Sequence, residues 1–399
     1  MIRTDSSLPL NGIRVLELGH AVMGPTCGLI LADMGAEVIK VERAPDGDDT
    51  RRLIGFGSGF FPFFNRNKKS ITIDLKSEKG KAVLRKLVRS ADVFIENFAP
   101  GTVDRLGFGY DEVSGINPRL IYCSLKGFMK GPYENRPALD EVVQMMGGLA
   151  YMTGPLGQPL RCGASVIDIM GGSYGAIGIL VGLYNREKTG RGEYIIASLY
   201  ESTAFLVGQH MTYSAVSGKP APPMPNRVSA WSIYDRFESK EGEMVFVGVT
   251  SDMQWKRFCE TFGLSSLSAD KRLATNNDRI AQREWLIPEL QNVFKKLEKS
   301  EILEQCEKGG VPFAPIAKPE DLFEDPQLNQ SGSLVDTTLP GGVKAKLPKI
   351  PVRIGSHDFG LRNNPPRVGE GSREVLKSIG ISDEEIEELQ NAGTLAFSS

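Results

Sequence analysis

Histidine is scarce in this chain of 399 residues, which contains only His20, His210 and His357. A Ser–His–Asp triad and a histidine-based metal centre therefore have little material, and we expect no metal site. The five cysteines are scattered, odd in number and without Cys-x-x-Cys spacing. This pattern argues against a disulfide framework and a structural zinc site, and it indicates a reducing compartment, the cytoplasm.

The sequence also lacks an excess of either charge and a long apolar run. Its net charge is −2, which excludes a broad basic surface and argues against nucleic acid as a partner. An anionic small molecule needs only a few local arginines and lysines. The N-terminus has no apolar signal region, and the longest apolar candidate, residues 177–184, covers about two helical turns. We therefore expect no membrane-spanning segment.

Strands and helices alternate in the first half of the chain. Residues 11–43 read as strand, helix and strand, a βαβ unit. The turn after the first strand, GHAVMGPTCG, lacks the GxGxxG spacing of a dinucleotide site, which argues against a nicotinamide-dependent enzyme. Further strands are expected within 65–76, 92–98, 118–125 and 192–199, separated by helices. The alternation predicts an α/β fold with a parallel sheet covered on both faces.

Polar residues follow several of these strands, namely Arg43, Lys76, Asn97 and Lys126. Carboxyl ends of parallel strands meet at one edge of a sheet, and open α/β sheets bind ligands there. We therefore expect these side chains to gather along one edge. An ordinary solvated charge is the alternative for each of them taken singly.

The composition changes after residue 216. Residues 217–226 (SGKPAPPMPN) contain four prolines and read as an extended linker. A second unit with its own strands and helices follows over 227–333. From about residue 334 the pattern becomes a Pro/Gly-rich crossover that leads into helices before the C-terminus.

Asp168 begins a distinctive helical pattern within residues 165–192. Glycines recur behind it at positions 171, 175, 178 and 182, which lie on one helical face. Such a glycine face costs helix stability and is kept where another backbone comes very close. Taken alone, Asp168 is best interpreted as an ordinary helix N-cap.

Seven motifs occur in order along the chain: LNGIRVLEL to ADMGAEVIKVER (10–43), NRNKKSITIDLK (65–76), DVFIENFAPGTVDRLGFGY (92–110), IYCSLKGF (121–128), ASVIDIMGG (164–172), NREKTGRGEYI (185–195) and VLKSIGISDEEIEEL (375–389). Together they resemble the class III CoA-transferases, the group of formyl-CoA:oxalate and carnitine CoA-transferases. The resemblance spans essentially the whole chain.

This resemblance implies a large Rossmann-like domain whose parallel sheet is built from both chain termini, a smaller α+β domain, and an interlocked homodimer. The implied boundaries are 1–216 for the first part of the large domain, 217–226 for the linker, 227–333 for the small domain, and 334–399 for the crossover and the return to the large domain. No cofactor is bound permanently, and a coenzyme A thioester is a substrate.

The resemblance assigns the nucleophile to Asp168. A carboxylate with an ordinary pKa near ~4 is ionised at neutral pH and needs no base to attack a thioester. The attack would form an acyl–aspartyl anhydride, and the released CoA thiolate would return to form an aspartyl-CoA thioester. The family pattern for CoA contacts falls on His20, Ala21, Val22, Arg43, Ile73, Lys76, Asn97, Phe98 and Arg105.

The chain also departs from the formyl-CoA enzyme. Pro137 and Leu139 stand where that enzyme has a lysine and a tyrosine, and NRVSAWSIYDRF replaces its run of glycines. Formyl-CoA and oxalate are therefore not the expected substrates. Two other segments, AWSIYD and PLRCGASVIDIMGG, are similar to members acting on C4–C6 dicarboxylates of the succinyl, mesaconyl or itaconyl type. Candidates to hold a distal carboxylate are Arg51, Arg52, Arg66, Arg161 and Arg227.

Two alternatives stay open. An α-methylacyl-CoA racemase shares the implied fold, but it removes a proton with a histidine, and Leu139 occupies that position here. Because racemisation needs a second acid/base group, this alternative is weaker. The other alternative is a catalytically silent protein that binds acyl-CoA.

Overall fold

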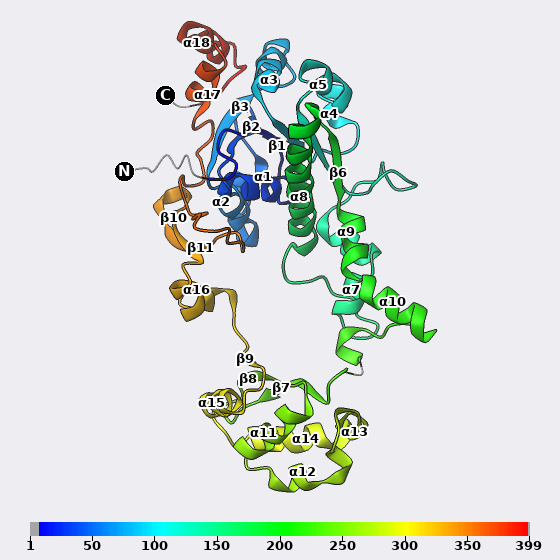
Figure 1. Cartoon of the computed structure of the whole chain (residues 1–399). Coiled ribbons are helices and arrows are strands. Elements are labelled where there is room, and N and C mark those ends of the chain that lie inside the picture. The colour runs from blue at the N-terminus through cyan, green and yellow to red at the C-terminus, as the bar shows by residue number, and fades with distance from the viewer. Residues whose placement is uncertain (1–7, 228, 398–399) are drawn as a thin grey trace. The chain divides into compact units, whose positions relative to one another are not determined.

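The computed structural model describes residues 8–227 and 229–397 and divides into two compact units (Figure 1). Unit 1 comprises Met1–Pro225 together with Pro326–Ser399, and unit 2 comprises Asn226–Asp325. Each unit has its own hydrophobic core. They are described separately below.

A six-stranded parallel sheet forms the centre of unit 1, as the alternating pattern predicts. Its order is β3-β2-β1-β4-β5-β6, the doubly wound order in which the direction of strand addition reverses between β1 and β4. All five neighbouring pairs are parallel. The strands are β1 (Arg14–Leu18), β2 (Glu37–Arg43), β3 (Lys68–Ile73), β4 (Val93–Glu96), β5 (Ile121–Lys126) and β6 (Tyr194–Ser198).

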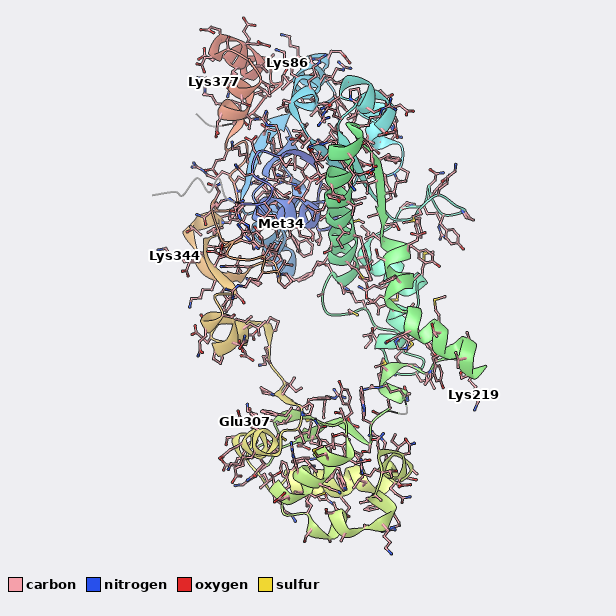
Figure 2. All side chains as sticks on the ribbon, viewed as in Figure 1. Met34, Lys86, Lys219, Glu307, Lys344 and Lys377 are labelled. Carbon is pink, nitrogen blue, oxygen red and sulfur yellow. The ribbon has the colours of Figure 1, made fainter. Side chains whose placement is uncertain are left out.

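Helices cover both faces of this sheet. The first face packs against α1 (Met23–Asp33) and α8 (Val166–Thr189), and the opposite face packs against α3 (Glu78–Ser90) and α5 (Tyr110–Ile116). Met34, which follows α1, lies within the first packed layer (Figure 2). Other helices of unit 1 are α2 (Phe60–Phe64), α4 (Thr102–Leu106), α6 (Asp140–Met146), α7 (Leu149–Thr153), α9 (Leu199–Leu206) and α10 (Gly208–Ser217).

The glycine face of α8 makes the close packing that its spacing predicts. A Cβ atom added at Gly175 or Gly178 would lie 2.6 Å from Leu125 or 2.7 Å from Ile195. The closest backbone contact lies beside the predicted stripe, at Gly172, where a Cβ would be 2.5 Å from the carbonyl oxygen of Met23 in α1. The missing side chains thus let α1 and α8 run together on the sheet.

The returning segment of the chain covers the β3 edge of the sheet. In chain order it contains α16 (Pro326–Gln330), the hairpin of β10 (Leu334–Thr338) and β11 (Lys344–Pro348), α17 (Ser372–Ser378) and α18 (Asp383–Asn391). Backbone hydrogen bonds join Ser70 to Glu370 and Asp74 to Thr394.

The prediction that both termini build the parallel sheet is wrong. All six strands come from residues 14–198, and the returning segment adds only one antiparallel bridge, between Ile73 and Leu395. Residues 363–371 (NNPPRVGEG) run beside this edge, and their prolines lack the N–H that a ladder needs. The segment therefore covers the edge without extending the sheet.

Unit 2 is an α+β arrangement around a three-stranded antiparallel sheet of order β7-β8-β9. The strands are β7 (Ile233–Glu238), β8 (Met244–Val249) and β9 (Phe313–Pro315), and the helices are α11 (Asp252–Thr261), α12 (Ser265–Ala269), α13 (Asn276–Ala281), α14 (Arg283–Phe294) and α15 (Lys299–Gly309). Aromatic residues such as Trp255, Phe258 and Phe294 fill its core.

One helix among the described residues, α8, is long and apolar enough to cross a membrane by length and composition alone. The expectation of no such stretch is therefore wrong on that criterion. The glycine face of α8 packs on α1, β5 and β6, and less than half of the apolar stretch is buried.

Candidate functional site

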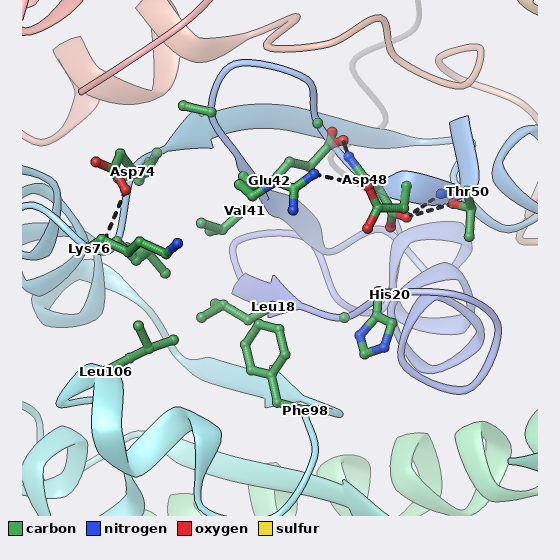
Figure 3. Close-up of a pocket in the computed structure, with 17 residues that line it drawn as sticks. Leu18, His20, Val41, Glu42, Asp48, Thr50, Asp74, Lys76, Phe98 and Leu106 are labelled. Atoms are coloured by element: carbon green, nitrogen blue, oxygen red, sulfur yellow. Dashed lines mark hydrogen bonds and ion pairs between the residues drawn. The ribbon is translucent and has the colours of Figure 1, made fainter. Parts of the chain in front are cut away.

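A pocket of about 480 Å³ opens at the carboxyl edge of β1, β2 and β3, beside the point where the strand order reverses (Figure 3). This volume lies in the range of small-molecule sites. Lys76 and His20 lie at opposite ends of the view, with Phe98 and Leu106 along one wall. Five of the nine residues predicted to contact CoA line this pocket: His20, Arg43, Ile73, Lys76 and Phe98.

The turn between β1 and α1 forms one wall, and Asn97 holds it. The Asn97 side chain accepts a hydrogen bond from His20 N and donates one to His20 O, both at 2.9 Å. Ala21 adopts a positive φ of 60°, and Val22 is buried at the start of α1. Ala21, Val22 and Asn97 were all predicted to contact CoA, but they shape the turn and do not line the pocket. Burial lowers the pKa of His20.

Exposed cations stand at the rim of the pocket. The Arg43 guanidinium is paired with Asp49 at 3.0 Å and is 60% exposed. Lys76 is exposed just beyond β3. Arg105 lies on α4, outside the pocket, and donates to Thr102 at 3.0 Å. Arg43 and Lys76 are the cations among the lining residues, which also include Glu42, Asp48, Asp49 and Asp74. An anionic group such as a phosphate would bind at these two cations.

Lys126, predicted from its strand-end position, is directed away from this pocket. It pairs with Glu96 at 2.8 Å and donates to the carbonyl of Phe98 at 3.0 Å. It lines a separate cavity near Tyr110, Tyr122 and Tyr194. Its role in unit 1 is to support the segment that follows β4.

Three of the arginines predicted to hold a substrate carboxylate are engaged within unit 1. Arg51 makes a bidentate pair with Glu42, at 2.6 and 2.7 Å, and stacks on Phe61. Arg66 is buried and makes a bidentate pair with Asp33, at 2.6 and 3.2 Å.

Arg52 pairs with Asp49 at 2.5 Å. These contacts favour structural roles for all three. Arg227 is exposed and belongs to unit 2.

Asp168 lies in the first turn of α8. The helix begins at Val166, and no local side chain caps its first N–H groups. Asp140, the first residue of α6, supplies the cap, because its Oδ2 accepts hydrogen bonds from Ile167 N at 2.9 Å and Asp168 N at 3.2 Å. The interpretation of Asp168 as the N-cap is therefore wrong, and its carboxylate is not used to cap α8.

The pKa of Asp168 is raised to about 7. Burial is the main cause, the neighbouring charge of Asp140 adds to it, and Arg161 opposes both. The expectation of an ordinary pKa near ~4 is wrong, because the sequence does not show the second carboxylate or the burial. A less solvated carboxylate with a higher pKa is a stronger nucleophile once it is ionised.

Arg161 and Gln144 hold Asp140 in place. Arg161 Nη2 lies 3.3 Å from Asp140 Oδ1 and donates to Ala164 O at 3.1 Å. Gln144 Nε2 donates to Asp140 Oδ1 at 2.6 Å, and its Oε1 accepts from Cys162 N at 2.9 Å. Arg161 is thus the predicted substrate arginine that lies closest to the environment of Asp168. Sequence reasoning missed Asp140. Its only signal was its position within residues 137–141 (PALDE), the segment that contains Pro137 and Leu139.

The pocket and Asp168 lie at the same edge of the sheet. Gly171 and Gly172, one helical turn after Asp168, pack against Met23. Met23 begins α1 and directly follows the turn that walls the pocket. A linear ligand seated in the pocket could therefore extend along the start of α1 toward Asp168.

The model of CoA-transferase family III matches residues 10–372. The chain belongs to this family. A succinate–glutarate CoA-transferase of Agrobacterium fabrum is 35% identical, with 93% of this chain and 96% of that protein covered. An acetyl-CoA:oxalate CoA-transferase of Acetobacter aceti is 38% identical, with 88% and 90% covered.

A solved structure of the same fold is that of a CAIB/BAIF family protein from Brucella suis. It has a TM-score of 0.83 and 34% identity, with 93% of this chain and 99% of that chain covered. The family and the names of these relatives identify the chain as a CoA-transferase. They do not favour the racemase or a silent CoA-binding protein.

Proposed function

We propose that this CoA-transferase moves CoA from an acyl-CoA thioester to a carboxylic acid, with Asp168 as the nucleophile. The observation that carries the proposal is the half-buried carboxylate of Asp168, which does not cap α8. It lies one helical turn before Gly171 and Gly172, which pack against Met23 directly after the turn that walls the pocket. The nucleotide end of CoA would occupy the pocket, with its phosphates near Arg43 and Lys76, and the pantetheine arm would pass the start of α1.

The proposed reaction proceeds through four acyl transfers. The Asp168 carboxylate attacks the thioester carbonyl, the C–S bond breaks, and an anhydride and the CoA thiolate form. The thiolate attacks the aspartyl carbonyl of the anhydride, which releases the donor acid and leaves an aspartyl-CoA thioester. The acceptor carboxylate attacks this thioester and forms a second anhydride, and the thiolate then attacks its acyl carbon and frees Asp168.

The mechanism is tested by replacing Asp168 and by searching for a covalent adduct on it. Asp168→Ala should abolish transfer and leave the affinity for CoA within about twofold, because the pocket is formed by other residues. Mass spectrometry after incubation of the wild type with acyl-CoA should detect a CoA adduct on the peptide that contains Asp168. Asp111→Ala, an exposed aspartate on α5, is the control. Transfer at the wild-type rate by Asp168→Ala would exclude the mechanism.

The substrate class we propose is the C4–C6 dicarboxylates. Support comes from relatives named for succinate and glutarate and from Arg161, whose guanidinium lies beside Asp140 near the nucleophile. Donors and acceptors should be assayed as a matrix of succinyl-, glutaryl-, mesaconyl-, acetyl- and formyl-CoA against the corresponding acids. Faster turnover with monocarboxylates than with dicarboxylates would contradict the proposal. α-Hydrogen exchange in deuterated water without transfer would favour the racemase.

We further propose an interlocked homodimer in the cytoplasm, with each chain threaded through its partner. Its support is the set of large apolar side chains that unit 1 exposes on α8, α9 and α10, including Val181, Phe205 and Val216. All five cysteines are free, in agreement with a reducing compartment. Light scattering should give twice the chain mass, and a monomer at micromolar concentration would contradict this proposal.

A further inference from the structure

An ionic layer lies beneath the pocket, between the sheet and α1. We use this name for Glu17 on β1, Lys40 and Glu42 on β2, Lys68 on β3, and their partners Asp48 and Arg51. Side chains two residues apart on a strand share a face, so Glu17 and Lys40 continue the face of Val15 and Val38. All six are paired, and their charges cancel. Apolar residues occupy the same strands on the opposite face, among them Leu16, Ile39 and Ile71.

Lys40 is the member of this layer that contacts two walls of the pocket. Its ammonium group is fully buried and has three acceptors: Gly19 O at 2.5 Å, Asp48 Oδ2 at 2.9 Å and Glu17 Oε1 at 3.3 Å. Gly19 belongs to the turn that carries His20, and Asp48 belongs to the loop after β2. Both residues line the pocket.

The charge of Lys40 is secure at neutral pH. Burial alone would lower its pKa, but Glu17 and Asp48 outweigh burial, so the pKa of Lys40 is raised. Asp48 is likewise held ionised, because Lys40 and Thr50 lower its pKa against the effect of burial. Because the three N–H groups of the ammonium face three oxygens, Lys40 holds Gly19 and Asp48, and with them both pocket walls, in fixed positions.

We infer that Lys40 is a positioning residue for the nucleotide end of the CoA thioester. It would set the separation of the His20 turn from the 43–50 loop without touching the ligand. The inference rests on the proposed binding of CoA in this pocket. It predicts that loss of Lys40 weakens the recognition of CoA and leaves the acyl-transfer chemistry at Asp168 intact.

Lys68 provides a matched control. It is also fully buried, forms an ion pair with Glu17 Oε2 at 2.7 Å, and donates to Pro25 O at 2.9 Å and Asn65 Oδ1 at 3.0 Å. None of its partners lines the pocket. Lys40→Met and Lys68→Met therefore each remove a buried positive charge that pairs with Glu17. Only Lys40→Met also removes contacts with the pocket residues Gly19 and Asp48.

The experiment compares two thioesters of the same acid, acyl-CoA and acyl-pantetheine. For Lys40→Met, kcat/KM with acyl-CoA should fall about tenfold to a hundredfold, the scale of a lost charged hydrogen bond, through KM with kcat retained. The value for acyl-pantetheine should stay within about twofold of the wild type. Affinity for 3′-phospho-ADP, measured by calorimetry, should fall by the same factor as that for CoA. Lys68→Met should leave these ratios unchanged.

The inference fails if Lys40→Met affects both thioesters equally, or if Lys68→Met weakens 3′-phospho-ADP binding as much. Should Lys40→Met not fold, Asp48→Asn keeps the cap on Thr50, weakens one Lys40 contact, and should raise KM for acyl-CoA several-fold with acyl-pantetheine unaffected. A wild type that binds neither CoA nor 3′-phospho-ADP overturns the proposed function as well. A wild type that binds both, with Lys40→Met unchanged, overturns only the role of Lys40.

Discussion

At the scale of single residues, the proposed chemistry depends on the pair of Asp140 and Asp168. Asp140 satisfies the first N–H groups of α8, and its charge then raises the pKa of Asp168. A helix N-terminus normally favours an ionised carboxylate. Here burial and the second carboxylate outweigh that effect, so Asp168 titrates near neutrality.

The rate of transfer should therefore depend on pH. A protonated Asp168 is no nucleophile, so kcat/KM should fall with unit slope as pH decreases below about 7. Asp140→Asn removes the neighbouring charge and should move this limb to lower pH. A pH–rate profile of both enzymes measures the effect. A wild-type limb near pH 4, or one that Asp140→Asn does not move, would contradict it.

The same pKa shift predicts a cost in stability. The pKa of Asp168 is about 7 in the folded protein and near its ordinary value of 3.8 when unfolded, so the carboxylate destabilises the fold increasingly from about pH 4 to pH 7. Asp168→Asn should therefore be more stable than the wild type by about 2 kcal/mol above pH 7, after allowance for partial solvation. Denaturant unfolding at pH 8 and pH 5 should show the gap closing at the lower pH.

The sequence revealed part of this site. The motifs predicted the role of Asp168, the family pattern predicted His20, and the positions after strands predicted Arg43 and Lys76. Asp140 and Lys40 could not be predicted, because their roles depend on partners distant in the chain. Arg66 looked like a ligand for a substrate carboxylate, but its buried partner Asp33 is 33 residues away and gave no signal.

At the scale of elements, the contact between α1 and α8 links the pocket to the proposed nucleophile, Asp168. Gly172 allows this contact, because a Cβ there would be 2.5 Å from Met23 O and 2.8 Å from Thr26 Cβ. Neither neighbour is the end of a flexible chain, so a side chain would push the helices apart.

Gly172→Ala should therefore destabilise unit 1 by about 1–3 kcal/mol, the usual cost of overpacking, and lower the rate of transfer. Gly115→Ala is the control, since Gly115 lies in α5 with nothing within 4 Å of an added Cβ. It should be neutral or stabilising by up to about 1 kcal/mol. Thermal unfolding of both variants tests the prediction, which fails if their melting temperatures change equally.

Periodicity predicted the regular elements well. The strand, helix and strand expected within 11–43 are β1, α1 and β2. It failed where tertiary contacts decide. The crossover expected from about residue 334 forms the β10–β11 hairpin.

At the scale of the whole molecule, Asn67 attaches the returning segment of the chain to the first part of unit 1. Its Oδ1 accepts from Arg362 N at 2.7 Å and Asn363 N at 2.9 Å, and its Nδ2 donates to Asp33 at 2.8 Å. Asn67→Ala should loosen this attachment and increase cleavage by trypsin in the segment after residue 349. Limited proteolysis with Asn277→Ala, an exposed site on α13, as the control would measure it. An unchanged cleavage pattern would contradict the prediction.

The cover over the β3 edge also has a consequence for the time at which this edge of the sheet is closed. Thr72, next to the pocket residue Ile73, bonds to the carbonyl of Ala396, 324 residues further along the chain. At a synthesis rate of about 5–20 residues per second, this cover leaves the ribosome roughly 15–60 s after β3. All the residues that line the pocket lie between Leu18 and Leu106, so they are synthesised long before the cover. The β3 edge of a nascent chain therefore stays open until translation has ended.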